Sequence, residues 1–490
     1  MNIAWTIAGN DSSGGAGITA DLLSFHHLNV QGCSVITAAT AQNAKGVEAV
    51  NLLSVEQIKS QISALKEIHA PTAIKIGMMG STEIIDTLKE CLTSIPAKIV
   101  LDPVMIASSG SSLCQAENKN YIQHLKKLLP LADLITPNLH EAAALIDADI
   151  HTQDDVIMAA EKILSFGAKT VVIKGGHFSR ENLGQDYWTD GSSSFWLCGK
   201  PWPQKNYHGS GCVFSAAVAA SLASAYSMQD ALVLAKMLIS RGMRLAKSHG
   251  ENIAYLQHGG LSEDPDDLPI VTSSISDEII SFPSCKEIGL YPVVDSIDWI
   301  KKLLALGVKT IQLRIKEKAD AALENEIRSA IQLARQFDAK LFINDHWQLA
   351  ILHGAYGVHL GQEDLNTADI RKIHAAGLHL GISTHSPYEV ARAHAWRPSY
   401  FAFGPIYHTN TKAMPFAPQG VDKLSWWRKV LKPHAVVAIG GINERNIADV
   451  VKTGVDGVAM ISAITGADDY AAMVKYFIEV TQGGLPLRSP

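Results

Sequence analysis

The sequence predicts two α/β domains in series, an open doubly wound sheet followed by a (β/α)8 barrel. In both halves, short β-rich runs ending in Gly, Pro or Asn alternate with helical segments. The segment 259–287 is rich in Gly, Pro, Ser and acidic residues and carries no sustained helical period. We therefore predict a first domain over 1–258, a linker over 259–287 and a second domain over 288–490.

The first half contains the strand-like runs "NIAWTIAG", "KIVLDPVM", "DLITPN" and "KTVVIKGG". Between the last two, residues 152–166 predict a helix that Gly167 closes. Its buried face is predicted from the apolar residues at helical spacing, which are Val156, Ala159, Ala160, Ile163 and Leu164. In an open sheet of this kind the ligand lies beyond the carboxyl ends of the strands.

The second half is more regular, and helix-like segments separate most of its strands. Eight runs are strand-like: "GLYPVV", "TIQLRI", "KLFIND", "GVHLG", "HLGIST", "YFAFGPI", "AVVAIGG" and "GVAMIS". Eight β/α units in about 200 residues are typical of a compact barrel, whose active site lies at the carboxyl ends of the strands. Strands two to eight each deliver polar residues or glycines to that rim: Gln312, Arg314, Lys316, Asn344, Asp345, Gly361, Gln362, Asp364, Ser383, Thr409, Thr411, Lys412, Gly440, Gly441 and Ser462.

The charges at this rim suit a polyphosphate with magnesium. Magnesium takes one or two carboxylates, here Asp345 and Asp364, together with phosphate oxygens. The cations Arg314, Lys316 and Lys412 would hold the remaining phosphate charge. Surface ion pairs at strand ends explain any one of these residues well but the whole set poorly. The functional interpretation is therefore the better one.

A second phosphate site is predicted at the same mouth. The glycine pair at 440–441 follows strand seven, and Ser462 ends strand eight. Barrel enzymes commonly bind phosphate between the loops after these two strands.

In the first half, "HGSGC" places Cys212 after Gly209 and Gly211 at the start of an Ala-rich helix. One interpretation is packing, because free cysteine is often buried. The other is chemistry, since the N–H groups and dipole of a helix N-terminus attract anions and lower a thiol pKa. These residues alone leave the two interpretations even.

Other polar residues of the first half have equally plain structural interpretations. The glycines of "GNDSSGGAGITAD" (9–21) suit either a tight turn or close approach of a ligand. Asn138 and Glu141 have the spacing of a helix cap, which we favour over a magnesium-linked carboxylate. Lys174 would meet a phosphate or extend along the surface. Asp102 would face magnesium or simply end a strand before Pro.

Bulk properties exclude several classes of protein. The net charge is −6 and no Lys/Arg block is present, which argues against nucleic acid or an anionic membrane as the main partner. Six cysteines stand far apart without a CxxC pair, so neither a zinc site nor a disulfide framework is predicted. The N-terminus has no basic segment before its short apolar run. We therefore expect a cytoplasmic protein.

Taken in order, the motifs of the first half resemble the hydroxymethylpyrimidine/phosphomethylpyrimidine kinases of thiamine biosynthesis, which have the ribokinase-like fold. These motifs are "GNDSSGGAGITADL", "TAQN", "KIGMM", "LDPVM", "TPNLHEA", "VIKGGH" and "HGSGC". The second half similarly resembles thiamine-phosphate synthase, through "QLRIK", "INDHWQLA", "GAYGVHLGQEDL", "GISTH", "GPIYHTNTK", "AIGGIN" and "ISAI". Departures are modest: Ser210, Asn10 and His408 stand where Thr, Ser and Pro are usual.

The resemblance implies roles in the kinase half. Cys212 takes the place of a catalytic Asp, with an anion hole at Gly209, Ser210 and Gly211. A thiolate there would accept a proton from the attacking hydroxyl. ATP, magnesium and the pyrimidine would be held by the remaining residues: Lys174, Asp102, Asn138 and Glu141 for the nucleotide and metal, and Gly9, Gln42 and Met79 for the pyrimidine. Such kinases are often dimers, so the resemblance also implies a homodimer.

For the synthase half the resemblance implies that Asp345 and Asp364 bind magnesium. The pyrimidine pyrophosphate would be held by Gln312, Arg314, Lys316, Asn344, Ser383 and Lys412. The thiazole phosphate would be held by Thr409, Thr411, Gly441, Ile461 and Ser462. In the implied reaction the pyrimidine–pyrophosphate bond ionises and the thiazole nitrogen captures the cation.

Together the two resemblances imply a bifunctional enzyme of thiamine biosynthesis, and two alternative functions remain. A pyridoxal-type kinase shares the fold and can share the cysteine, although "TAQN" and "GMM" count against it. A ligand-binding module that has lost catalysis in one half is opposed by the intact Cys212, Asp345, Asp364 and Lys412. The long linker predicts a raised local concentration of the intermediate rather than a tunnel.

Overall fold

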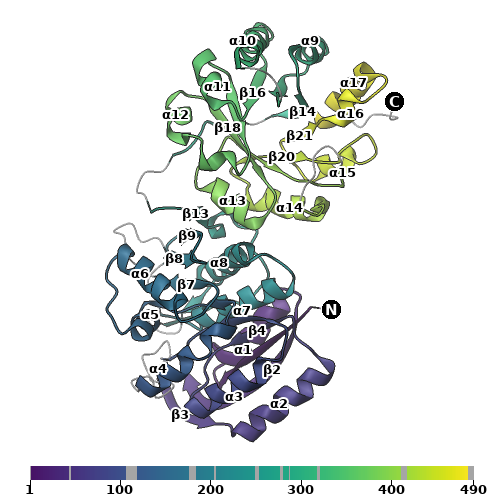
Figure 1. Cartoon of the computed structure of the whole chain (residues 1–490). Coiled ribbons are helices and arrows are strands. Elements are labelled where there is room, and N and C mark those ends of the chain that lie inside the picture. Colours follow the sequence, from purple (N-terminus) through teal and green to yellow (C-terminus); the bar gives the residue numbers. More distant parts are fainter. Residues whose placement is uncertain are drawn as a thin grey trace. The chain divides into compact units, whose positions relative to one another are not determined.

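The chain folds into two compact units, Met1–Asp277 and Glu278–Pro490. The fold is described from a computed structural model. The residues that it describes are 2–43, 46–105, 119–175, 184–202, 206–248, 253–275, 280–285, 287–316, 320–409 and 416–483. Figure 1 shows the elements of each unit along the chain.

Unit 1 is built on a 10-stranded sheet in the order β13-β9-β8-β7-β6-β5-β4-β1-β2-β3. Its centre is parallel and consists of β1 (Ile3–Asp11), β2 (Gln31–Asn43), β4 (Ala73–Ile76), β5 (Lys98–Leu101), β6 (Leu134–Ile135) and β7 (Val171–Lys174). Antiparallel strands flank it: β3 (Gly46–Leu52), β8 (Gly184–Thr189), β9 (Ser194–Gly199) and β13 (Ile270–Thr272). A second, small sheet contains β10 (Asn206–His208), β12 (Ile253–Tyr255) and β11 (Lys247–Ser248).

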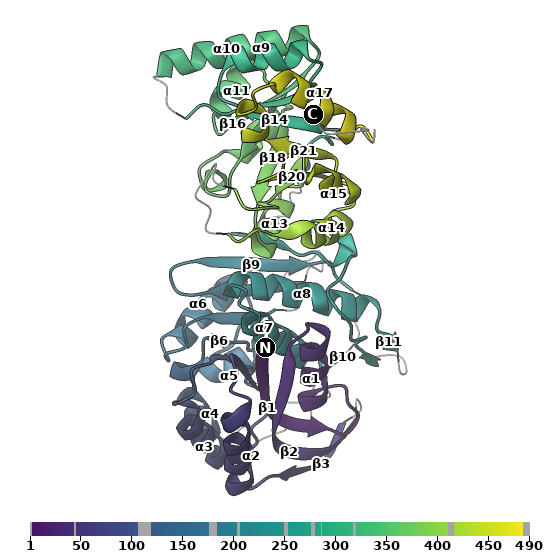
Figure 2. The ribbon, with the colours of Figure 1, turned by 90° about the vertical axis from the view of Figure 1, so that its right-hand side faces the viewer.

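Helices cover both faces of the large sheet, as the doubly wound prediction requires. One face carries α1 (Gly17–His27), α7 (Ser210–Ala223) and α8 (Met228–Arg244), which contact one another (Figure 2). The other carries a row of neighbours: α2 (Val55–Ile68), α3 (Thr82–Leu92), α4 (Lys119–Lys126), α5 (Leu139–Ile146) and α6 (Gln153–Leu164). A 3-10 turn, Leu129–Leu131, precedes β6.

The predicted helix over 152–166 is confirmed as α6. Thr152 caps it, because its side chain accepts from the Asp155 N–H while the Asp155 side chain bonds back to the Thr152 backbone. Val156, Ala159 and Ile163 are buried, as the spacing predicted. The apolar face of α6 thereby packs on the sheet. Such tertiary packing provides most of the stability of a helix in a protein.

The segment predicted as a linker contains more structure than its composition indicated. Residues 265–267 form a 3-10 turn (Pro265–Asp267), and β13 pairs antiparallel with β9. Arg244 donates hydrogen bonds from Nε and Nη2 to the buried Asp267 carboxylate, with Nη2–Oδ2 at 2.6 Å. Backbone pairing at a sheet edge needs only three residues of strand, too few to give a periodic signal.

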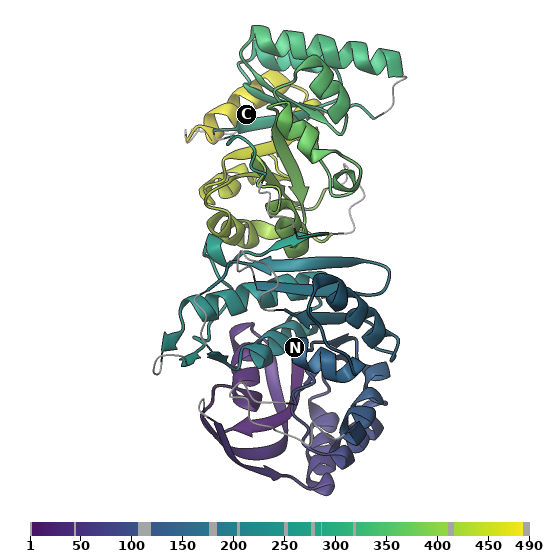
Figure 3. The same cartoon turned by 90° about the vertical axis from the view of Figure 1, so that its left-hand side faces the viewer.

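Unit 2 is a closed barrel of eight parallel strands in sequence order, which confirms the predicted architecture. The strands are β14 (Gly289–Val294), β15 (Thr310–Leu313), β16 (Lys340–Asn344), β17 (Gly357–Leu360), β18 (His379–Thr384), β19 (Tyr400–Phe403), β20 (Ala435–Ile439) and β21 (Gly457–Met460). The helices lie outside them (Figure 3): α9 (Ile297–Ala305), α10 (Asp320–Gln336), α11 (Trp347–His353), α12 (Ile370–Ala375), α13 (Pro387–His394), α14 (Gly420–Val430), α15 (Ile447–Lys452), α16 (Ser462–Thr465) and α17 (Tyr470–Thr481).

Aromatic side chains fill the interior of the barrel. Tyr291, Phe342 and Tyr400 pack edge to face with ring centroids 5.2 to 5.8 Å apart. Gly381 makes room for them, because a Cβ there would overlap the Tyr400 ring. The interior is therefore a packed core, and ligands can bind only at its ends.

Candidate active sites

In unit 1, two glycine-rich segments far apart in sequence meet at the carboxyl ends of the central strands. Asp11, at the end of β1, accepts hydrogen bonds from the backbone N–H groups of Ser13 and Ala16, both at 2.9 Å. Its other partner is His208 Nε2 at 2.8 Å, from the residue before the "GSGC" turn. Burial raises the pKa of Asp11, but the His208 and Ser13 bonds outweigh it and the pKa is lowered. A buried Asp–His pair thus joins the two segments.

Gly209 is required at the start of α7. Its φ is +80°, and a Cβ would overlap the carbonyl oxygen of Gly15. A Cβ on Gly211 would lie 3.0 Å from Lys174 Nζ. The two glycines therefore let the loop after β1 and a lysine approach the N-terminus of a 14-residue helix, where free N–H groups favour an anion.

Cys212 lies in the first turn of α7, and its pKa bears on the two interpretations that the sequence left open. Burial raises the pKa of the thiol to about 11, against the opposing charge of Lys75 and a hydrogen bond from the Gly17 backbone. The chemical interpretation implied a lowered pKa at the helix N-terminus. Desolvation prevails because Asp21 and Asp102 also place negative charge near the sulfur. At neutral pH Cys212 is a thiol.

Alkylation tests this protonation state. With a pKa raised from 9.0 to about 11, the thiolate fraction at pH 8 is roughly 100-fold below that of an ordinary cysteine. The rate of Cys212 modification, followed by peptide mass spectrometry, should still rise with pH beyond 9. The urea-unfolded chain is the control, and there the rise should level off near 9. Fastest modification at Cys212 at pH 7 would contradict the assignment.

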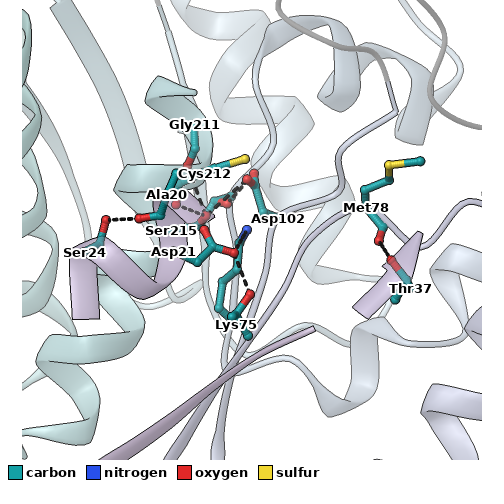
Figure 4. Close-up of polar contacts among 12 residues, drawn as sticks. Ala20, Asp21, Ser24, Thr37, Lys75, Met78, Asp102, Gly211, Cys212 and Ser215 are labelled. Carbon is teal, nitrogen blue, oxygen red and sulfur yellow. Dashed lines mark hydrogen bonds and ion pairs between the residues drawn. The ribbon is translucent and has the colours of Figure 1, made fainter. Parts of the chain in front are cut away.

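A buried ion pair lies beneath Cys212 (Figure 4). Lys75 Nζ donates to Asp21 Oδ2 at 2.7 Å, and both side chains are fully buried. The charges of Asp21, Cys212 and Asp102 raise the pKa of Lys75 although burial opposes them. Thr6 donates a further hydrogen bond to the same Asp21 oxygen at 2.6 Å. Lys75 is therefore a fixed positive charge below the thiol.

Lys174 ends β7 and bonds to Asp102, at the end of β5, at 2.9 Å. Burial opposes both charges, but the attraction of neighbouring opposite charges outweighs it. Asp102 and Glu141 raise the pKa of Lys174. Lys174 and Lys75 lower the pKa of Asp102. Thr136 and Ser215 also donate to Asp102, at 3.0 and 3.1 Å. The side chain of Lys174 remains 17% exposed, enough to reach a ligand phosphate.

The cap predicted at Asn138 and Glu141 is confirmed. Glu141 N–H donates to Asn138 Oδ1 at 2.9 Å, and Asn138 N–H donates to Glu141 Oε2 at 2.8 Å. Burial raises the pKa of Glu141 to about 7, with Asp102 adding to it and Lys174 opposing. Such a carboxylate is a good ligand for a cation, so the cap does not exclude a second role.

The residues predicted to hold a pyrimidine lie near this end of the sheet. Gly9 is on β1, and a Cβ there would come within 3.0 Å of Met78 Sδ. Gln42 is joined to the loop after β1 through Ser12, whose hydroxyl accepts from the Gln42 N–H at 2.9 Å. Met79 is 1% exposed and packs in the hydrophobic core, so the side chain beside Gly9 is that of Met78, which the sequence analysis missed.

In unit 2, Asp345 follows β16 and Asp364 lies in a 3-10 turn after β17, Asp364–Asn366. Burial, the charge of Asp364 and a hydrogen bond with it together raise the pKa of Asp345 to about 6, against the charge of Arg314. Asp345 has a φ of +62°, which is uncommon outside glycine and is typical of functional sites. The two predicted carboxylates are thus brought together.

The pair fits a divalent cation. Two facing carboxylates repel one another, a bound cation relieves that repulsion, and carboxylate oxygens suit magnesium. Within the described ranges no group of three or more His, Cys, Asp or Glu could hold a metal ion. Magnesium in such sites usually keeps several waters and binds substrate phosphate oxygens.

Two of the other predicted pyrophosphate residues, Arg314 and Asn344, interact with Asp345. Arg314 and Lys316 follow β15, where Arg314 acts on the charge of Asp345. Asn344 ends β16 and bonds to the Asp345 carboxylate. Gln312 lies on β15 and Ser383 on β18, and Gln362 fixes Ser383 by donating to its carbonyl oxygen at 2.7 Å.

Three of the predicted thiazole-phosphate residues, Gly441, Ile461 and Ser462, follow β20 and β21. Gly441 has a φ of +66°, and a Cβ would overlap the His408 carbonyl oxygen. Ile461 caps the short helix α16, which Ser462 begins. Thr409 ends the described part of the loop after β19. Thr411 and Lys412 lie outside the described residues.

Family models match both units. Residues 11–256 match the model described as phosphomethylpyrimidine kinase, and residues 290–464 match thiamine monophosphate synthase. The thiamine-phosphate synthase of Serratia proteamaculans is 51% identical over 43% of this chain and 99% of its own length. That of Photorhabdus laumondii is 54% identical over 40% and 93%. The chain belongs to the phosphomethylpyrimidine kinase and thiamine-phosphate synthase families.

This kinase–synthase is therefore a transferase with two activities in thiamine biosynthesis. Its kinase unit has the ribokinase-like fold. Staphylococcus aureus pyridoxal kinase, solved in complex with AMP-PCP, superposes with a TM-score of 0.50 at 30% identity, over 56% of this chain and 98% of that one. Clostridium difficile phosphomethylpyrimidine kinase is 41% identical over 49% and 98%, with a TM-score of 0.43. Among the described helices of the kinase–synthase, none is long and apolar enough to cross a membrane.

Sequence reasoning missed several residues of the two sites. Lys75 stands inside the apolar run "AIKIG". Lysine is almost never fully buried unless it is paired, so a lysine within a strand that is otherwise apolar is a signal of a buried ion pair. His208 adjoins "GSGC" but carries no spacing relation to Asp11. His359, in "GVHLG", occupies an inward strand position next to the predicted synthase site.

Proposed function

We propose that unit 1 phosphorylates the hydroxymethylpyrimidine and then its monophosphate with ATP and magnesium. Unit 2 couples the resulting pyrophosphate with hydroxyethylthiazole phosphate to give thiamine phosphate and pyrophosphate. The observation that carries the synthase assignment is the carboxylate pair Asp345–Asp364 beside Arg314 at the strand ends. The protein acts as a cytoplasmic enzyme, and its kinase unit associates as a homodimer.

In the kinase reaction the N–H groups of Gly209, Gly211 and Cys212 hold the transferring phosphoryl group at the helix N-terminus. Lys174 adds a positive charge, and Asp102 holds that lysine in place at 2.9 Å. Phosphoryl transfer depends chiefly on such positioning and charge stabilisation. Asp102, Asn138 and Glu141 lie where they would hold ATP-bound magnesium, which would neutralise developing phosphate charge.

Cys212 acts mainly by position. Because its thiol is protonated at neutral pH, Cys212 accepts a proton from the substrate hydroxyl only in the small fraction that is ionised, and it returns to the thiol as it does so. Lys75 stabilises that thiolate fraction, since its charge is what opposes the raised pKa. Gly9 and Gln42 bind the pyrimidine, with Met78 beside Gly9 in place of the core residue Met79.

In the synthase reaction Gln312, Arg314, Lys316, Asn344, Ser383 and Lys412 hold the pyrimidine pyrophosphate. Magnesium on Asp345 and Asp364 would stabilise the charge that develops on the leaving pyrophosphate. Arg314 and Lys316 hold the same charge through hydrogen bonds. The thiazole phosphate binds at Thr409, Thr411, Gly441, Ile461 and Ser462, so both substrates meet at one mouth.

The deciding experiment supplies pyrimidine monophosphate, ATP, magnesium and thiazole phosphate, and measures thiamine phosphate. Wild type should form product. Cys212→Ala should lose it by about 100-fold, the usual cost of a positioned proton-transfer group. Supplying pyrimidine pyrophosphate should restore product in the variant. No wild-type product even with supplied pyrophosphate would exclude synthase activity and favour a binding module.

A pyridoxal kinase activity is the second candidate, because S. aureus pyridoxal kinase solved with pyridoxal superposes on unit 1 with a TM-score of 0.50. Phosphorylation of pyridoxal and of the hydroxymethylpyrimidine should be compared at equal concentrations. A higher kcat/KM for the pyrimidine is expected. The reverse order would assign unit 1 to pyridoxal.

A further inference from the structure

A line of five hydrogen-bonding side chains crosses the interior of the barrel. Gln312 Nε2 donates to Tyr291 Oη at 3.2 Å, and Tyr291 Oη lies 2.7 Å from Tyr400 Oη. Tyr400 Oη lies 2.8 Å from His359 Nδ1, and His359 Nε2 lies 2.8 Å from Ser383 Oγ. The five residues come from five strands, β15, β14, β19, β17 and β18. The line therefore joins two predicted substrate residues, Gln312 and Ser383, through the core.

Four of the five side chains are buried. Gln312 is 4% exposed, Tyr291 1%, Tyr400 0% and His359 6%. Bulk water therefore does not reach these four side chains, and we expect each buried proton to have its acceptor within the line. Ser383 is partly exposed, since it ends the line at the strand ends.

The direction of the line follows from counting protons. Each tyrosine has one proton to donate. Because Tyr291 accepts from Gln312, it donates its own proton to Tyr400, and Tyr400 then donates to His359 Nδ1. In the opposite direction Tyr291 would accept from both neighbours, and its buried proton would have no acceptor in the line.

His359 is neutral in this setting. Its two ring nitrogens face the hydroxyl groups of Tyr400 and Ser383. Burial lowers the pKa of His359, and the charges of Arg314 and His385 lower it further. A neutral ring that accepts at Nδ1 carries its proton on Nε2.

We propose that this line fixes His359 as the Nε2–H form, so that Ser383 accepts from His359 and directs its own proton to a ring nitrogen of the bound pyrimidine. Gln312, Tyr291, Tyr400 and His359 are then positioning residues for a specificity contact made by Ser383. The proton position in His359 is inferred from the hydrogen-bond geometry of the line alone. The identity of the ligand rests on the proposed function of unit 2.

Nitrogen-15 spectra of histidine-labelled protein at neutral pH test the proton position directly. The His359 signals are identified by their loss in His359→Gln. We expect a protonated Nε2 and an unprotonated Nδ1. Gln312→Glu offers only acceptor oxygens, so the line should reverse and the proton should move to Nδ1. A proton on Nδ1 in wild type would overturn the proposal.

Tyr356→Phe is the matched control. Tyr356 packs against Phe342 in the same core but stands outside the line. It should leave the His359 signals unchanged, whereas Tyr400→Phe should shift them by removing the donor to Nδ1. Equal shifts in both variants would mean that the signals report general packing, and the line would have no directing role.

Substrate analogues test the contact with the pyrimidine. Two analogues of the pyrimidine pyrophosphate each carry C–H in place of one ring nitrogen. Ser383→Ala should lower kcat/KM about 10-fold with the natural substrate and with one analogue, and not with the other. Comparing variant with wild type on each substrate cancels differences in intrinsic reactivity. Equal losses on all three substrates would overturn the contact.

The proposed function of unit 2 and the proton position in His359 can be contradicted independently. Wild type that makes no thiamine phosphate from natural substrate would contradict the proposed function. The nitrogen-15 spectra would still decide the proton position, because they need no substrate.

Discussion

Asp345→Asn is expected to lower the kcat/KM of thiamine phosphate formation from supplied pyrimidine pyrophosphate by at least about 100-fold, because a bound cation contributes several kcal/mol to stabilising developing charge. Asn tolerates the left-handed backbone at this position as Asp does, so the fold is retained. The substitution also removes one of two repelling carboxylates. The thermal midpoint of unit 2 should therefore not fall. Steady-state kinetics over a range of magnesium concentrations, with a thermal melt, measure both effects.

Glu363→Gln is the matched control, since it removes the same charge from the exposed residue next to Asp364. It should change kcat/KM little. If Asp345→Asn costs no more than this control, the carboxylate pair does not bind the metal. If its melting midpoint falls instead, the role of Asp345 is structural.

Lys75→Met is expected to destabilise the kinase unit by about 3–5 kcal/mol, because it leaves the buried Asp21 charge without a partner. Asp21 Oδ1 has no hydrogen-bond partner among the described residues, so the carboxylate would keep the Thr6 hydroxyl as a donor to Oδ2 but no cation. Urea unfolding followed by fluorescence measures the loss. Removing the lysine should also slow Cys212 alkylation further, since Lys75 opposes the raised thiol pKa.

Two comparisons separate this effect from general damage. Lys59→Met breaks an ion pair with Glu90 whose side chains are 46% and 71% exposed, and exposed pairs are worth about 0–1 kcal/mol. Asp21→Asn combined with Lys75→Met should recover part of the stability. Equal losses for Lys59→Met and Lys75→Met would show that burial of the pair is not what matters.

The barrel could be predicted well from sequence because its signals are local. Each strand is an apolar run of four to six residues that ends at a polar residue or glycine. Once eight such runs are counted, closure of the barrel brings Asp345, Asp364 and Arg314 to one rim without further information. The His359–Ser383 contact could not be predicted, because it depends on which strands face one another across the interior.

Protonation states in unit 1 could not be predicted from local pattern. The helix N-terminus at Cys212 indicates a lowered thiol pKa. The actual shift depends on burial and on Asp21 and Asp102, which come from other elements of the fold. The cap at Asn138 was predictable because both partners lie within three residues of each other.

The pairing of β13 with β9 decides where the two activities can be separated. A kinase ended at residue 258, as composition alone suggests, would lack Asp267, the partner of Arg244, and would expose the backbone of β9. An uncovered strand edge invites pairing between molecules. A free-standing kinase should therefore carry the chain through Thr272, and the shorter version should precipitate during purification.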